Sequence, residues 1–487
     1  MAGAAAAAAA AALAGLEGLG HAPDPDPTSE HERWRREAAR ALASGVTSGE
    51  CKVLQVVQTL GPLLTTDSAH KRLQGMLVLA DVLGMCSGAL DVGEVDQIGT
   101  FLCERMKDWH TLRATLAGCK GLLKGARDAA ALASAAKVVN ALFASVDVQS
   151  HSQPNRQLSF EVLDLALGRH GAPLLRALEE DALEALSRLV DGEKDPRCLL
   201  AAFGCFNLTI GALVSTGNED LRGEALHADR AEAAADVLSC YFPLSFSPPP
   251  VPPQPSQKRI TRDDLLQGLF SVYASCPELF PQALGLLKDR MPSPKPGTKR
   301  EGIMLLTKCL EANDAATVAT HAEEIWQLLR GPALAHTAQL ATVPTRAGAA
   351  GGAGADDAAA EEALACARLA SRMADGKVTP ESIPFLEAVL SDPAVKAARE
   401  AAHGGRGVEG DARAALAAVA RVASASPAAL QVRILWGGLG PPPERAPVYE
   451  REGPPPYAYV EGGPSREMCQ AAKATGGILA VGGQIRF

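Results

Sequence analysis

The chain has 487 residues, of which 47 are basic and 56 acidic, so its formal net charge is −9. Aromatic residues make up only 4%, alanine and leucine dominate, and β-branched residues rarely cluster. This composition favours helices over sheets. The charge balance, together with the lack of any long basic run, argues against direct nucleic-acid binding.

The first 30 residues are alanine-rich, and we expect them to form a low-complexity, disordered N-terminus. They lack the basic region of a secretory signal and the arginines of a transit peptide. Their apolar run is too weakly hydrophobic and too short to cross a bilayer, and we expect no other segment to reach that length. The sequence therefore predicts a soluble protein without a membrane segment.

A repeat of polar turn, arginine and apolar helix runs along the chain. The arginines are Arg72, Arg113, Arg156 and Arg197, at spacings of 41, 43 and 41 residues, and Arg300 repeats the pattern further on. Other amphipathic segments lie between these helices. A two-helix unit of about 40 residues is typical of HEAT and armadillo repeats. The sequence therefore predicts an all-α fold, an α-solenoid over residues 31–330.

Each helix that follows an arginine carries apolar residues at the helical period. Leu199, Phe203, Phe206 and Ile210 form one such stripe. A second stripe comprises Leu73, Met76, Leu77, Ala80 and Leu83. We expect both stripes to be buried between neighbouring repeats.

The turns before these helices carry paired charges. In two of them an aspartate precedes the arginine by five residues, as in HEAT-type repeats where a turn aspartate pairs with the arginine of the next helix. Ordinary solvated turn charges are the alternative. We expect a structural ladder formed by Asp67, Arg72, Asp108, Arg113, Asp195 and Arg197.

A proline-rich segment at 243–259 interrupts the repeat. Such a run can form neither a helix nor an inner strand. We expect it to be a structural insertion between repeats, with Tyr241, Phe242 and Phe246 packing its start onto the solenoid. A sharper alternative is that its exposed face and these aromatic residues contact a partner. A new helix is expected behind a cap at Thr261.

The character of the sequence changes after residue 330. Residues 331–362 are rich in glycine and alanine and are expected to be a linker. Residues 363–430 are alanine-rich with a weak helical pattern, and residues 431–487 are rich in proline and glycine, typical of a disordered tail.

The sequence offers no constellation of catalytic residues, so we expect no enzyme and no catalytic site. Phosphate-binding, nucleophile-elbow, zinc-protease and dinucleotide motifs are all missing. His321 and Glu324 could supply only two ligands to a metal, too few for a site. The charges of residues 191–195 are better explained as capping charges at a turn.

The eleven cysteines contain no C-x-x-C pair. Cluster ligands normally include cysteines within a few residues of each other on a loop. Cys198 and Cys205, the closest pair, lie two helical turns apart in an apolar stripe. We therefore expect buried, slowly reacting thiols and no bound metal or cofactor.

Two stretches give a specific resemblance. They are "LVDGEKDPRCLLAAFGCFNLTI" and the segment that runs from "VLSCYFPLSFSPPPVPP" to "ITRDDLLQGLFSVYASCPELFPQALGLLKDRM". Both resemble the N-terminal region of the MMS-nineteen family, which has a D-G-E-K-D-P-R turn, a Y-F-P stop, three prolines and an R-[ED]-D-L helix start. Further motifs match in the same order over about residues 50 to 330. Family members are considerably longer, and their C-terminal repeats dock other subunits.

The resemblance implies a HEAT-repeat scaffold without a cofactor, a non-catalytic adaptor of cytosolic iron–sulfur protein assembly. Such an adaptor brings the assembly targeting subunits to apo iron–sulfur clients of DNA repair, replication and transcription, such as helicases and polymerases, in cytoplasm and nucleus. It would bind neither nucleic acid nor a membrane directly. Two alternatives stay open: a transport-receptor-like solenoid, and a direct regulator of the transcription and repair helicase complex.

Overall fold

The computed structural model describes residues 30–125, 128–215, 228–246, 259–293 and 297–331, with single positions in 385–396 and short strands in 479–486. The chain divides into two compact units, Met1–Leu279 and Phe280–Phe487, which are described separately.

The described part of the first unit is helical. Short 3-10 turns, η1 (Ser87–Ala89), η2 (Val148–Ser150) and η3 (Pro277–Leu279), link some of its helices. The helices are α2 (Glu30–Thr47), α3 (Val53–Leu64), α4 (Ala69–Cys86), α5 (Val92–Arg105), α6 (Leu112–Gly125), α7 (Asp128–Ser145), α8 (Gln153–Ala177), α9 (Ala182–Val190), α10 (Pro196–Ser215), α11 (Ala228–Ser239) and α12 (Arg262–Tyr273).

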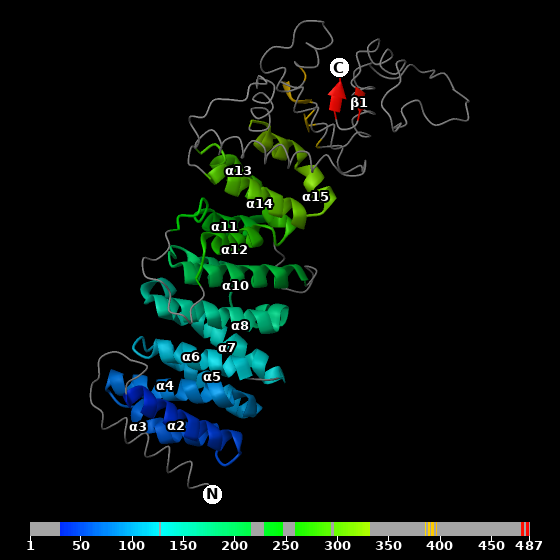
Figure 1. Ribbon diagram of the computed structural model, residues 1–487. Coiled ribbons are helices and arrows are strands. Elements are labelled where there is room, and N and C mark those ends of the chain that lie inside the picture. Colours follow the sequence, from blue (N-terminus) through cyan, green and yellow to red (C-terminus); the bar gives the residue numbers. More distant parts are fainter. Residues whose placement is uncertain are drawn as a thin grey trace. The chain divides into compact units, whose positions relative to one another are not determined.

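These helices pack in two layers. Helices α2, α4, α6, α8, α10 and α12 are neighbours in one layer, each touching the next, while α5 packs on α7 and α9 on α11 in the other. Figure 1 shows the helices of this unit stacked in chain order. Because each helix pair contacts mainly the pairs beside it, this is the arrangement of a repeat solenoid. The predicted all-α solenoid is confirmed.

The repeating pair consists of an odd-numbered and an even-numbered helix, beginning with α3 and α4. The pair α11 and α12 follows α9 and α10, so the long interval after Arg197 contains a further complete pair. Helix α11 packs on α9 and helix α12 packs on α10, so the proline-rich segment lies in the chain between a helix of one layer and a helix of the other. Its place between repeats stays a prediction. Its residues 247–258 lie outside the described part of the chain.

The buried face of α4 is wider than its predicted stripe. Val78, Leu79 and Val82 are fully buried, whereas Leu73 and Leu77 are only partly buried. Helix α4 has α2 and α6 on either side and α3 in the other layer, so three sides of it are covered. A pattern that assumes a single buried face therefore does not identify the buried residues of α4 correctly.

Helix α10 matches its prediction, because the four residues of its stripe are all buried. By length and composition alone α10 could cross a membrane, which corrects the expectation that no segment reaches that length. More than half of this apolar stretch is buried in the fold, where α10 packs between α8 and α12.

Helix ends in this unit follow ordinary capping chemistry. The Thr261 hydroxyl accepts from the backbone N–H of Asp264 at 3.1 Å, and the Asp264 carboxylate accepts from the backbone N–H of Thr261 at 2.8 Å. This reciprocal pair confirms the predicted start of α12. The Asp181 carboxylate caps α9 by accepting from the backbone N–H groups of Leu183 and Glu184. Helix α8 is broken at Gly171, whose positive φ of 50° suits glycine.

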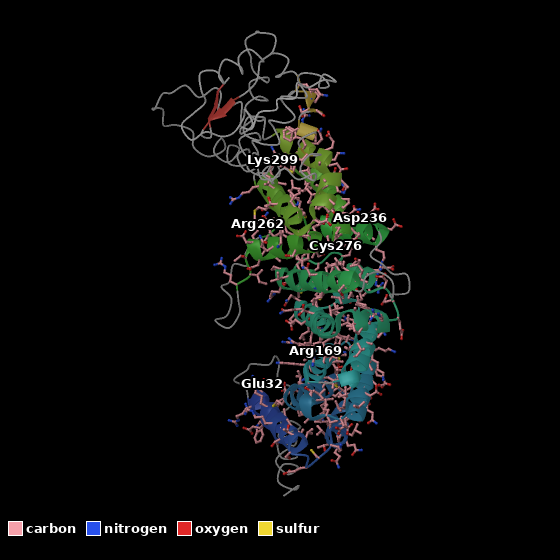
Figure 2. All side chains as sticks on the ribbon, turned by 90° about the vertical axis from the view of Figure 1, so that its right-hand side faces the viewer. Glu32, Arg169, Asp236, Arg262, Cys276 and Lys299 are labelled. Atoms are coloured by element: carbon pink, nitrogen blue, oxygen red, sulfur yellow. The ribbon has the colours of Figure 1, made fainter. Side chains whose placement is uncertain are left out.

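Gly121 lets α6 approach the backbone of α4 closely. A Cβ atom on Gly121 of α6 would lie 2.9 Å from the backbone nitrogen of Gly84 and 3.1 Å from its Cα atom. Nearby, the guanidinium of Arg169, labelled in Figure 2, donates to the backbone carbonyls of Leu123 and Lys124 at the end of α6. Helix α6 is thus in close backbone contact with α4 and is tied at its end to α8 by the two hydrogen bonds of Arg169.

In the second unit the described helices are α13 (Phe280–Arg290), α14 (Thr298–Ala312), α15 (Ala315–Thr320) and a segment at 322–331. The buried Asp392 carboxylate accepts from the Trp326 indole at 3.0 Å and pairs with Arg330 at 2.8 Å. Phe385 packs edge-on against Trp326.

Part of the alanine-rich segment predicted at 363–430 is therefore packed by large side chains, which its composition did not indicate. Within the predicted tail, β1 (Leu479–Val481) and β2 (Gln484–Arg486) form an antiparallel hairpin in which Ala480 faces Ile485.

Candidate partner-binding surface

The turns that join the two helices of each pair lie along one edge of the first unit, because the even-numbered helices stack side by side and all begin there. We call this edge the turn edge. Its turns are residues 65–68, 106–111, 146–152 and 191–195, together with the described ends, 240–246 and 259–261, of the segment between α11 and α12.

Arg72 links the first two of these turns. Its Nε donates to Oδ2 of Asp108 at 2.9 Å, and its Nη1 donates to the backbone carbonyls of Thr66 and Asp67 at 3.0 and 2.9 Å. Burial would raise the pKa of Asp108, but the Arg72 guanidinium holds that pKa below its ordinary value. The arginine thus holds its own turn and the next one.

Arg156 makes the same connection two pairs later. Its guanidinium donates to both carboxylate oxygens of Glu193 at 2.8 and 3.0 Å and to the His151 carbonyl at 2.9 Å. The side chain of Glu193 is fully buried and also accepts from the backbone N–H groups of Lys194 and Asp195. Burial raises the pKa of Glu193, yet these donors lower it below its ordinary value overall.

The ladder therefore exists with different partners from those predicted. Asp108 pairs with Arg72 of the preceding pair and not with Arg113, which is exposed and makes no ion pair with any described residue. Asp67 contributes its backbone carbonyl to Arg72, where its carboxylate was expected. Asp195 and Arg197 do pair, within a single turn, at 2.9 Å.

Sequence reasoning assigned Glu193 to capping and missed its place in the ladder. The signal was spacing: Asp108 lies 36 residues after Arg72, and Glu193 lies 37 residues after Arg156. Each arginine is separated from its acidic partner by slightly less than one repeat, because its side chain pairs with an acid in the turn of the following helix pair.

The aromatic stop at the end of α11 is structural. The Tyr241 hydroxyl donates to the Val190 carbonyl at 2.7 Å, and its ring meets Phe203 edge-on. Burial raises the pKa of Tyr241 to about 12. Phe242 is 1% exposed and packs near Phe270. Tyr241 and Phe242 therefore pack onto the stack, with Phe242 buried and Tyr241 half-buried. Phe246 is also half-buried.

The described cysteines are mostly buried thiols. Cys198 and Cys205 are fully buried on α10, and burial raises the pKa of Cys198 to about 12. The pKa of Cys205 is raised for the same reason. Cys240 is the exposed member of the described set. The Nδ1 atom of His321 lies 3.4 Å from Oε2 of Glu324. Among the described residues, no three histidine, cysteine or acidic side chains come together as ligands for a metal ion.

The turn between α5 and α6 carries the most exposed large hydrophobic side chain of the described residues. Trp109 is 66% exposed, and its ring centroid lies 3.5 Å from that of His110. Lys107 and Arg113 on either side are also exposed. Sequence reasoning did not single out this tryptophan.

The amino-acid sequence of this helical stack matches that of a known protein family. Residues 57–334, which include every arginine-led helix, match the N-terminal MMS19 family, described as Dos2-interacting transcription regulator of RNA-Pol-II. The chain belongs to the MMS19 family. This confirms the resemblance found in the sequence.

MMS19 relatives from distant eukaryotes align over the same region. The protein named MMS19 nucleotide excision repair protein homolog is 31% identical in Mus musculus, 30% in Homo sapiens and 28% in Arabidopsis thaliana. Each alignment covers 60% of this chain and 25–27% of the relative. The chain thus spans about a quarter of the length of the MMS19 proteins it matches.

Proposed function

We propose that the chain is a non-catalytic scaffold of the MMS19 type, an adaptor of the cytosolic iron–sulfur assembly targeting complex. In this role it brings assembly subunits to apoproteins of DNA repair, replication and transcription, such as helicases and polymerases, in the cytoplasm and nucleus. The observation that carries the proposal is the match of residues 57–334 to the family on a two-layer helical stack. The names of its relatives refer to nucleotide excision repair.

The chemistry of the described residues suits a scaffold. A solenoid presents long surfaces to partners, and its ionised side chains here are used to join one turn to the next. The buried thiols have raised pKa values, which disfavours the thiolate that a metal needs. Recognition of partners through the surface is the function that such a fold supports best.

A second candidate is direct regulation of the transcription and repair helicase complex. The family description, a transcription regulator of RNA polymerase II, favours it. In that case the chain would bind subunits of the helicase complex without the assembly subunits.

Affinity purification of the tagged full chain from cell extract separates these candidates, with the tag alone as control. Recovery of assembly subunits together with apo iron–sulfur proteins is expected. Recovery of helicase-complex subunits alone would favour the regulator, and nuclear transport cargo would favour a transport receptor. Either result overturns the assembly role.

The absence of a cofactor is tested separately by anaerobic purification followed by iron and zinc analysis and a visible spectrum. We expect substoichiometric metal. Stoichiometric iron with a charge-transfer band, lost on replacing Cys198 and Cys205 by alanine, would contradict the scaffold role. A Cys240→Ala variant is the matched control, because that thiol is exposed.

A further inference from the structure

Trp109 is in an unusual place for its residue type. It is 66% exposed on a turn, whereas Trp326 in the other unit is fully buried and hydrogen-bonded. Isolated exposed leucines or valines are ordinary on a surface, but an exposed tryptophan leaves a large apolar area in water. Tryptophan is also the residue type most enriched where binding energy is concentrated in protein interfaces.

Hydrogen bonds within the chain order the backbone of the turn that carries Trp109. The backbone N–H of Asp108 donates to the Arg105 carbonyl at 3.0 Å, and that of Thr111 donates to the Asp108 carbonyl at 3.0 Å. The Asp108 carboxylate accepts from the His110 N–H and from Arg72 of the preceding pair. A preordered anchor loses less conformational entropy on binding than a mobile one.

The charge around Trp109 is positive. Lys107 and Arg113 are exposed, and neither forms an ion pair with a described residue. Asp108 within the turn is neutralised by Arg72. The exposed acid nearest in the sequence is Glu104, in the last turn of α5. Lys107 and Arg113 flank Trp109 in the sequence, so a partner that covers this turn meets two exposed cationic side chains.

The positive surface is short. The neighbouring turns on the same edge present exposed Asp67 and Asp147. A nucleic acid strand requires a basic track that follows its backbone over several nucleotides, and such a track is interrupted here on both sides. An acidic peptide of a few residues fits the charge and the length.

We propose that Lys107, Trp109 and Arg113 form a docking surface for a short acidic peptide segment of a partner protein, with Trp109 packing against an apolar side chain of that segment. The proposal rests on the scaffold function in one respect, that partners are bound on the surface of the stack. It names the chemistry of one such partner segment: carboxylates flanking an apolar residue.

The test measures fluorescence anisotropy of a labelled synthetic peptide of aspartate and glutamate with a central leucine, titrated with the purified full chain. A peptide in which lysine replaces every acid and a single-stranded oligonucleotide are the other probes. We expect the acidic peptide to bind, the lysine peptide not to bind, and added salt to weaken the complex.

Trp109→Ala should weaken peptide binding by about tenfold or more, as for a tryptophan at the centre of an interface. The double variant Lys107→Glu and Arg113→Glu should abolish it. Val92→Ala is the matched control, because Val92, the first residue of α5, is 65% exposed away from the proposed surface and its loss should leave binding unchanged. Unaltered circular dichroism establishes that each variant is folded.

Three results would overturn the proposal: no binding of the acidic peptide to the unaltered chain, equal effects of Trp109→Ala and Val92→Ala, or tighter binding of the oligonucleotide than of the peptide. Failure here is distinct from failure of the scaffold function, since recovery of assembly subunits from extract is measured independently of the peptide.

Discussion

Replacing Gly121 by alanine places a methyl group against the backbone of the preceding helix pair. The added Cβ atom would lie 2.9 Å from the nitrogen of Gly84, 3.1 Å from its Cα atom and 3.2 Å from the carbonyl carbon of Leu83. All three contacts are with backbone atoms, so no side chain can rotate away. Helices α4 and α6 must separate, or α6 must shift.

The magnitude follows from two opposed terms. Overpacking a well-packed contact costs about 1–3 kcal/mol, and the rigid backbone of Gly84 favours the upper part of that range. Alanine is a better helix former than glycine by about 0.5–1 kcal/mol, which offsets part of the cost. We expect Gly121→Ala to destabilise the stack by about 1–2 kcal/mol.

Gly84→Ala is the matched control, on the facing helix of the same contact. A Cβ atom there meets nothing within 4 Å, so only the helix-propensity term remains and the variant should be stabilised by about 0.5–1 kcal/mol. Urea unfolding followed by circular dichroism, with hydrogen exchange of α4 and α6, measures both. If Gly121→Ala is as stable as Gly84→Ala, the two helices are not in backbone contact at this point.

Three further predictions concern the core, the ladder and the thiols. In urea unfolding, Leu116→Ala should lower the free energy of unfolding by about 2–5 kcal/mol because Leu116 is fully buried. Arg113→Ala should lower it by well under about 1 kcal/mol because Arg113 is exposed. A larger loss for Arg113→Ala than for Leu116→Ala would show that Arg113 is a structural residue. Glu193→Gln should lower the free energy of unfolding by about 1.5–3 kcal/mol at neutral pH. Because the pKa of Glu193 is lowered in the folded state, the ionised carboxylate stabilises the fold, and this loss of stability should shrink as the pH falls below the ordinary pKa of the carboxyl group. A loss that does not change with pH would show that the charge of Glu193 does not stabilise the fold. A thiol reagent should label Cys240 in the native chain while Cys205 reacts only on unfolding, and mass spectrometry that finds Cys205 labelled first would contradict the packing of α10.

The repeat could be predicted because it has a regular spacing, and the fold class followed from it. The partners of the ladder could not be found by looking within each turn. The hydrogen bonds of Arg72 and Arg156 reach forward to acids of the following turn, so the pairs are distant in sequence and adjacent only when the helix pairs stack. A search for acids one repeat further along would have found Asp108 and Glu193.

The stripe of α4 and the exposure of Trp109 were beyond the sequence for a different reason. Periodicity reports one buried face, but a helix between two neighbours and a second layer is buried on three. From the sequence, an aromatic residue at a turn can equally be an anchor onto the stack, as Tyr241 is, or a side chain in water, as Trp109 is. Only the position of the next pair decides between them.

The forward reach of the arginines has a mechanical consequence. We call the contact between two successive helix pairs a joint. Because the joints lie in series along the first unit, a pull along this unit loads each of them equally. The guanidinium–carboxylate bonds of Arg72 and Arg156 reinforce two joints, and Arg113, which would serve the joint between α6 and α8, makes no such bond with a described residue. We therefore expect the turn edge to open more readily at this joint than at the two joints held by Arg72 and Arg156. Away from the turn edge, α6 and α8 stay joined by the Lys120–Glu161 pair and by the hydrogen bonds of Arg169 to the end of α6.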